Sequence, residues 1–292
     1  MTGFHHHMFT CRQHMVALLD ALFPLACMML MVAALTSGAR AASCDSMGPE
    51  DHLPALTNEK LSIQARLLCN TAFAVLHSGL AHEPVWSAER LTAQAIRQAE
   101  ATPRRGEFQP DERLPAGEGA QLTDYVHSGY DRGHMTPSGD MPDEATQAES
   151  FRLSNVVPQS AALNRGKWEE IESAVRRLTL RDGEVYVVTG PAFHARRLSS
   201  IGHDRVLVPT STWKAIYDPR RQAAGVYVCR NALRNPGCNR VTINVLIHTV
   251  GVDPFPALPS ALKQTYITLP LRTVRHTTSR YRTHRVRHYW RE

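Results

Sequence analysis

Net charge is scarce along most of this chain, and its scarcity excludes one class of nucleic-acid-binding protein. The 292 residues carry a net charge of +6, yet residues 42–274 hold 25 basic and 25 acidic side chains. A body that attracts polyanions through its overall charge is therefore excluded. Residues 275–292 hold six arginines and one acid, so a basic C-terminal tail is expected there. The hydrophobic content of 43% and the charged content of 21% exclude a disordered or fibrous protein.

Cysteine is also sparse, and no CxxC spacing supports a zinc site. Two of the six cysteines lie in the first 41 residues. Among the remaining four, sequence proximity favours disulfides between Cys44 and Cys69 and between Cys229 and Cys238. A zinc site is the competing interpretation. Disulfides would indicate an oxidising compartment.

The N-terminal segment lacks charged side chains from residue 21 to residue 39 and is rich in apolar ones. Arg12 precedes this segment, and a small-x-small sequence at 39–41 follows it. These features predict a secretory signal peptide over residues 1–41, with the mature protein periplasmic or secreted and without a stable membrane span. An uncleaved membrane anchor is one alternative, because nineteen uncharged residues are enough to span a bilayer. Lipidation at Cys44, which small residues precede, is another.

Hydrophobic patterns predict helices and strands in mixed order along the chain. Strands are expected over residues 71–77, 185–189, 206–217 and 225–230. Helices are expected over residues 87–100 and 164–178. Residues 242–250 fit either a strand or a short helix, since Thr242 suits an N-cap and Gly251 suits the position after the helix. The mixture predicts an α+β fold with one domain from residue 44 to residue 272.

A first cluster of chemically useful side chains lies in residues 103–143, which are dense in glycine, proline and aspartate. Loops of this length in a compact domain are usually functional. Inside the loop stands the sequence Asp131-Arg132-Gly133-His134. Arginine matches the geometry of phosphate, and histidine can take a proton near neutral pH. The cluster is a candidate for phosphate ester cleavage, and the alternative is an Asp–Arg surface pair beside a loop histidine.

A second cluster follows the stretch Asn-Val-Val-Pro-Gln at 155–159. Asn164, Trp168 and Glu172 recur at every fourth residue, so a helix would place them on one face. An amide oxygen and a carboxylate suit Mg²⁺, which keeps most of its waters and needs few protein ligands. The alternatives are that Asn164 caps the helix and that Glu172 lies on a solvated face.

Together the two clusters resemble the DNA/RNA non-specific endonuclease family, the ββα-metal nucleases that include endonuclease G. The resemblance rests on the Asp-Arg-Gly-His motif, the thirty-residue step from His134 to Asn164 and the eight further residues to Glu172. It covers about residues 69–270. It implies a central mixed or antiparallel sheet flanked by helices, and a Mg²⁺-dependent hydrolase that cuts DNA, RNA or both with little sequence preference.

The resemblance also implies which residues act on the metal and on the water. His134 would be the general base that takes a proton from the attacking water. Asn164 would be the direct protein ligand of a single Mg²⁺, or of Mn²⁺ in its place. Glu172 would orient the water around that ion.

Phosphate contacts are implied in the same way. Arg105 would bind the phosphoryl oxygens, or Arg104 would, because the local register is open. Arg132 would be a second phosphate contact, and Asp131 would anchor the turn.

Three hypotheses for the whole protein stay open at this point. One is an exported endonuclease with 5′-phosphate products, and another is a non-catalytic nucleic-acid-binding or DNA-uptake protein on the same scaffold. The third is a nuclease effector delivered to another cell. An inhibitor protein and a homodimer are partners that the sequence neither requires nor excludes.

Overall fold

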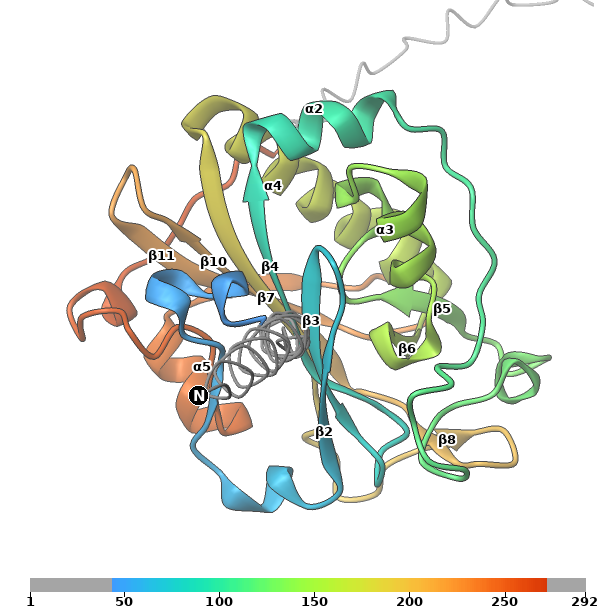
Figure 1. The fold of residues 1–292 in the computed structure, drawn as a ribbon. Coiled ribbons are helices and arrows are strands. Elements are labelled where there is room, and N and C mark those ends of the chain that lie inside the picture. Colours follow the sequence, from blue (N-terminus) through green and yellow to red (C-terminus); the bar gives the residue numbers. More distant parts are fainter. Residues whose placement is uncertain (1–43, 272–292) are drawn as a thin grey trace, which may run out of the picture. The chain divides into compact units, whose positions relative to one another are not determined.

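A seven-stranded antiparallel sheet organises residues 44–271, the part of the chain that the computed structural model describes (Figure 1). Its strand order is β12-β11-β10-β7-β4-β3-β2. The strands are β2 (Ala65–Cys69), β3 (Phe73–Ser78), β4 (Glu83–Thr92), β7 (Glu184–Ala192), β10 (Ser211–Asp218), β11 (Ala223–Arg230) and β12 (Cys238–Val241). The predicted α+β class is therefore confirmed. The predicted signal peptide (1–41) and basic tail (275–292) lie outside the described residues.

Helices cover both faces of the sheet because both faces are apolar. Trp86, Ala88 and Trp213 form one core with α5 (Ile243–Val250). On the other face Leu91, Val187 and Ile216 form a second core with α2 (Ala93–Ala101) and α4 (Glu169–Asp182). Figure 1 shows α5 on the opposite side of the strands from α2 and α4. Among residues 44–271, none of these helices is long and apolar enough to cross a bilayer.

A short strand pair brings the two clusters of the sequence together. β5 (Asp131–His134) pairs antiparallel with β6 (Val156–Gln159), and the chain then enters a π-helical turn, Leu163–Trp168, that leads directly into α4. The long loop before β6 also carries α3 (Glu144–Ser150). The remaining pairs are β1 (Ala55–Leu56) with β13 (Val252–Asp253) and β8 (Ser200–Ile201) with β9 (Val206–Leu207).

The prediction of a helix over 87–100 is wrong in its first part, because residues 87–92 belong to β4. Trp86 and Ala88 pack into one core while Leu91 packs into the other. Burial on two faces overrides the helix propensity of these residues. The helix begins only after Thr92, whose hydroxyl accepts a hydrogen bond from the Ala95 amide at 3.1 Å as an N-cap.

The structure also decides the predictions for residues 206–217 and 242–250. The strand expected over 206–217 is split into β9 and β10, and Pro209, which has no N–H to donate to a ladder, lies between them. Residues 242–250 form the helix rather than the strand. Thr242 accepts a hydrogen bond from the Val245 amide at 3.3 Å, and Gly251 closes the helix in the left-handed region at φ 74°.

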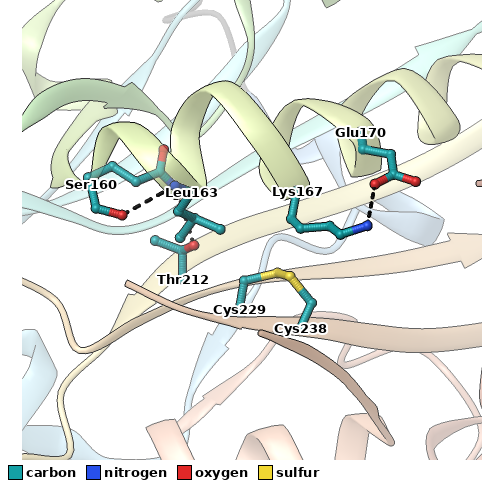
Figure 2. Close-up of a disulfide and its surroundings, with 8 residues drawn as sticks. Ser160, Leu163, Lys167, Glu170, Thr212, Cys229 and Cys238 are labelled. Atoms are coloured by element: carbon teal, nitrogen blue, oxygen red, sulfur yellow. Dashed lines mark hydrogen bonds and ion pairs between the residues drawn. A yellow bond between two sulfur atoms is a disulfide. The ribbon is translucent and has the colours of Figure 1, made fainter. Parts of the chain in front are cut away.

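Cys44 is bonded to Cys69 and Cys229 to Cys238, the pairing that sequence proximity favours. The second bond joins facing residues of β11 and β12. Figure 2 shows this bond below the helical segment that carries Lys167 and Glu170.

Loss of the Cys229–Cys238 bond should destabilise the fold. The bond closes a loop and so lowers the conformational entropy of the unfolded chain. Without it, the variant Cys229→Ala/Cys238→Ser should have a free energy of unfolding lower by about 2–4 kcal/mol. Urea unfolding of the oxidised proteins measures the difference, and a thiol count shows whether Cys44–Cys69 is intact in the variant. An unchanged urea midpoint would contradict the expectation.

Candidate active site

A cavity of about 580 Å³ opens where β5, the π-helical turn and α4 meet. Its lining brings together most of the side chains singled out in the sequence: Arg104, Asp131, Arg132, His134, Asn164 and Glu172. Arg105 does not line it. The lining also includes three further charged residues: Arg165, Glu169 and Arg176.

His134 is held neutral by its surroundings. Its side chain ends β5 and is flanked by the rings of Phe108 and Phe151, with centroids 5.0 and 4.9 Å away. This burial, together with the positive charge of Arg104, lowers the pKa of His134 to about 3. The Nε2 atom has no hydrogen-bond partner within the described chain. At neutral pH the imidazole is therefore an uncharged base facing a cationic cavity.

Close packing of two strands fixes the backbone around His134. An added Cβ at Gly133 would lie 2.5 Å from the Cβ of Gln159, so the strand pair admits only glycine there. Just beyond His134, the buried Asn155 accepts a hydrogen bond from the Thr136 amide (3.0 Å) and donates to the Thr136 carbonyl (2.9 Å). These two hydrogen bonds from Asn155 therefore fix the backbone of the segment that follows His134.

Asp131 anchors another residue of the site rather than its own turn. Its carboxylate accepts a hydrogen bond from the Asn164 amide nitrogen at 3.0 Å and two from the Arg165 guanidinium at 2.8 and 2.6 Å. The alternative interpretation, an ion pair between Asp131 and Arg132, does not hold, because Asp131 pairs with Arg165. With its nitrogen held by Asp131, Asn164 leaves its amide oxygen outside every hydrogen bond of the described residues.

Asn164 lies inside a helical turn and does not cap it. The turn is π-helical and contains a non-helical residue, Gly166, at φ −124° and ψ −109°. The side chains of Asn164 and Glu172 both reach the cavity, whereas Trp168 between them is buried in the core. The expectation of one regular helix face is therefore wrong in detail, because the π turn shifts the register between Asn164 and α4.

Glu172 lies in surroundings that disfavour its ionised form. Burial raises the pKa of Glu172 to about 7, although the charges of Lys214 and Arg176 act in the opposite direction. One turn later Arg176 donates to Asp140 at 2.8 Å, which fixes the guanidinium beside the cavity. Glu172 is thus a carboxyl group that a nearby cation would readily convert to the ionised form.

The two neighbouring arginines of the loop lie in different surroundings. Arg104 lines the cavity and rests 5.5 Å from the ring of Phe151, the ring that also flanks His134. Arg105 is highly exposed and forms an ion pair with Glu144 at 3.4 Å. Of the two arginines, Arg104 is therefore the one that lies beside the imidazole in the cavity.

Arg132 reaches the cavity from the same strand as His134. Its guanidinium carbon lies 5.5 Å from the ring centres of Phe108 and Tyr125. Stacking on two rings holds a planar cation in place without neutralising it. Arg132 can therefore meet an anion in the cavity.

The donor atoms fit a hard divalent cation better than zinc. The candidate donors are the free amide oxygen of Asn164 and the carboxylate of Glu172, both on the cavity wall. Among residues 44–271 no group of three or more His, Cys, Asp or Glu side chains could hold a metal. Mg²⁺ binds through one or two protein oxygens and keeps several waters, whereas zinc is held by three or four Cys, His, Asp or Glu side chains.

Sequence reasoning missed Arg165 and Arg176. Neither arginine was assigned a role from the sequence, although Arg165 directly follows Asn164 in the stretch Asn-Arg-Gly-Lys-Trp at 164–168. A signal existed for Arg176, which lies four residues after Glu172 and therefore on the same face of α4. No local signal existed for Arg165, because its partner Asp131 lies 34 residues away.

Comparison with known proteins agrees with this geometry. The family model described as DNA/RNA non-specific endonuclease matches residues 55–261. The chain is 37% identical over 164 residues to "Nuclease EXOG, mitochondrial" of Danio rerio, covering 51% of this chain and 48% of the relative. It is 33% identical over 166 residues to "Nuclease" of a Nostoc species, covering 55% and 57%. The chain thus spans about half the length of the curated relatives it matches.

A solved structure shares the fold. A chain in the crystal structure of the EndoG/EndoGI complex superposes with a TM-score of 0.60 and 29% identity, covering 65% of this chain and 86% of that one. The match of the family model spans more than half of the chain. This chain belongs to the DNA/RNA non-specific endonuclease family.

Proposed function

We propose that the protein is a periplasmic or secreted endonuclease that requires a divalent cation, Mg²⁺ in particular, and hydrolyses DNA and RNA to products with 5′-phosphates. The observation that carries the proposal is the pairing of a neutral, buried imidazole with cationic side chains in one cavity. His134 offers an unpartnered nitrogen there, and Arg104 and Arg132 offer charge. Phosphodiester hydrolysis needs both a base and charge stabilisation.

In the proposed reaction His134 takes a proton from a water molecule as the water oxygen attacks phosphorus. The bond between phosphorus and the 3′ oxygen breaks, and its electron pair leaves on that oxygen, which takes a proton from solvent water. His134 then releases its proton to solvent. The products are a 3′-hydroxyl and a 5′-phosphate. Asn164 and Glu172 would hold the cation, which when bound supplies charge neutralisation at the scissile phosphate and at the departing oxygen.

Little sequence preference follows from the same lining. Guanidinium groups recognise phosphate oxygens, and contacts to phosphate carry no information about the base. Asn164 is the one uncharged amide among the proposed catalytic residues, and its nitrogen is already held by Asp131. The cavity therefore favours a backbone-reading enzyme.

Substitution of the two loop arginines should separate their roles. Arg104→Met should lower kcat by about 10²-fold, because it removes a cation placed to stabilise charge in the transition state. Arg105→Met removes an exposed ion pair and should change kcat and stability little. Steady-state cleavage of a duplex measures both, and the reverse order of effects would return the role to Arg105.

The substrate range is tested by digesting duplex DNA, single-stranded DNA and RNA side by side in defined Mg²⁺. Cleavage of all three, with ends that a ligase joins without added kinase, is the expected result. Ends that require phosphorylation before ligation would overturn the assignment of 5′-phosphate products. Binding without cleavage of any substrate would favour the non-catalytic alternative.

Export and partners rest on other features. The two disulfides support export to an oxidising compartment.

Protein partners stay predictions. The crystal structure of the EndoG/EndoGI complex concerns inhibition of EndoG, and an inhibitor protein for this chain is proposed by analogy. A homodimer is likewise a prediction. The basic tail (275–292) would add phosphate contacts outside the cavity, and its removal should then flatten the salt dependence of DNA binding.

A further inference from the structure

Lys214 is a fully buried lysine in the middle of the central sheet. It lies on β10, faces the side covered by α4 and is only 1% exposed. Within residues 44–271 it takes part in none of the ion pairs shorter than 4 Å, unlike the half-buried Lys263, which pairs with Asp253 at 2.6 Å. Burial of an ammonium group costs several kcal/mol unless its surroundings compensate. An apolar side chain would pack there more cheaply, so the charge calls for an explanation.

The ammonium group contacts both halves of the candidate active site. It donates to the carbonyl of Met135, the residue directly after His134, at 3.3 Å. It also lies 5.3 Å from the ring centre of Trp168, which is midway between Asn164 and Glu172 in the sequence. A third contact, with the Thr189 hydroxyl at 2.7 Å, ties it to the neighbouring strand β7.

A buried carboxyl group also lies near the ammonium group. Glu89 on β4 is only 1% exposed, and neither of its carboxylate oxygens has a hydrogen-bond partner among the described residues. Burial raises the pKa of Glu89, and the charge of Lys214 acts in the opposite direction. Lys214 therefore lies close to a buried acid as well as beside the catalytic segments.

We propose that Lys214 is a positioning residue that holds the His134 strand and the Asn164–Glu172 helix in catalytic register. This inference rests on the proposed nuclease function. Within residues 44–271, Lys214 is the only side chain that both donates a hydrogen bond to the Met135 carbonyl and places a cation over the Trp168 ring. A buried ammonium group held between the base and the metal ligands constrains their separation, and a displacement of about 1 Å at such a point can cost about 10²-fold in rate.

The test compares Lys214→Met with the wild type and with a matched control, Lys263→Met. Lys214→Met should lower kcat per folded molecule by about 10²-fold in saturating Mg²⁺ and duplex DNA. Its Kd for duplex DNA in EDTA should stay within about twofold, since the residue does not reach the cavity surface where phosphates bind.

Lys263→Met removes a structural ion pair on another part of the molecule and should leave kcat per folded molecule unchanged. Circular dichroism gives the folded fraction of every variant. Equal kcat in Lys214→Met and wild type would overturn the proposal, as would a loss of activity that only follows the folded fraction. Equal losses in the two Met variants would overturn it as well.

If Lys214→Met does not fold, Thr189→Val decides, because it removes the 2.7 Å partner of the ammonium while keeping the shape of the side chain. A kcat reduced by about tenfold with an unchanged KM supports positioning, and an unchanged kcat overturns it. An inactive wild type would instead refute the proposed nuclease function, which separates the two failures.

Discussion

Replacement of His134 by alanine is expected to lower the rate of DNA cleavage by at least about 10²-fold while the protein stays folded. The imidazole is the one neutral base that the cavity offers at pH 7, since burial and the charge of Arg104 lower the pKa of His134 to about 3. Its Nε2 atom is already free of internal partners. Initial rates on duplex DNA, normalised to the folded fraction, measure the effect.

The matched control is His77, another buried histidine, which does not line the cavity. Its Nε2 atom forms a 2.8 Å hydrogen bond with the Glu118 carbonyl. His77→Gln should keep the rate per folded molecule. A folded His134→Ala protein with a rate near that of wild type would remove His134 from the mechanism.

The same variant should also change the response of the fold to acid. Because the pKa of folded His134 is about 3 and its ordinary value is 6.5, the unfolded state binds the proton first as pH falls. Stability is therefore lost as pH drops from about 6.5 towards 3. His134→Ala should lose less unfolding free energy than wild type between pH 7 and pH 5 in urea titrations. An identical loss in both proteins would contradict the depressed pKa.

Asn164→Ala is expected to abolish cleavage and to weaken Mg²⁺ binding. The residue does not cap its helix, and its amide oxygen is free because Asp131 holds the nitrogen. Asn164→Asp keeps an oxygen ligand, so it should retain more Mg²⁺ binding than the alanine variant, although it places a second carboxylate beside Asp131. Titration calorimetry of Mg²⁺ and the rate at saturating Mg²⁺ measure the two effects separately.

The control for a purely structural loss is a true helix cap. Thr242→Ala should cost about 1 kcal/mol of stability and leave both cleavage and Mg²⁺ binding unchanged. If Asn164→Ala behaves like Thr242→Ala, with a small loss of stability and normal Mg²⁺ dependence, Asn164 is structural.

The candidate site could be predicted from the sequence only where its signal is local. The Asp-Arg-Gly-His motif and the spacing of Asn164 and Glu172 lie within short stretches, and all of them except Gly133 line the cavity. The partners of Asp131 could not be predicted, because they are Asn164 and Arg165, 33 and 34 residues away. The choice between Arg104 and Arg105 also depends on tertiary structure, since it turns on which side chain meets Phe151.

Secondary structure, too, could be predicted only where its signal is local. Strands such as β7 and β11 carry their own apolar signal, and the cap of α5 at Thr242 is readable in the sequence. The second half of β4 could not be predicted, because residues 88–91 are good helix formers that become a strand only between two cores. Lys214 lies beyond any local pattern, since its contacts to Met135 and Trp168 join segments far apart in the chain.

The most direct test of the central claim is cleavage of supercoiled plasmid by the purified protein with and without a divalent cation. The account predicts nicking and then linearisation in Mg²⁺, complete arrest in EDTA and recovery when Mg²⁺ is restored. Cleavage that continues unchanged in EDTA would contradict a cation held by Asn164 and Glu172. A protein that leaves the plasmid intact in Mg²⁺ and in Mn²⁺ would contradict the nuclease assignment itself.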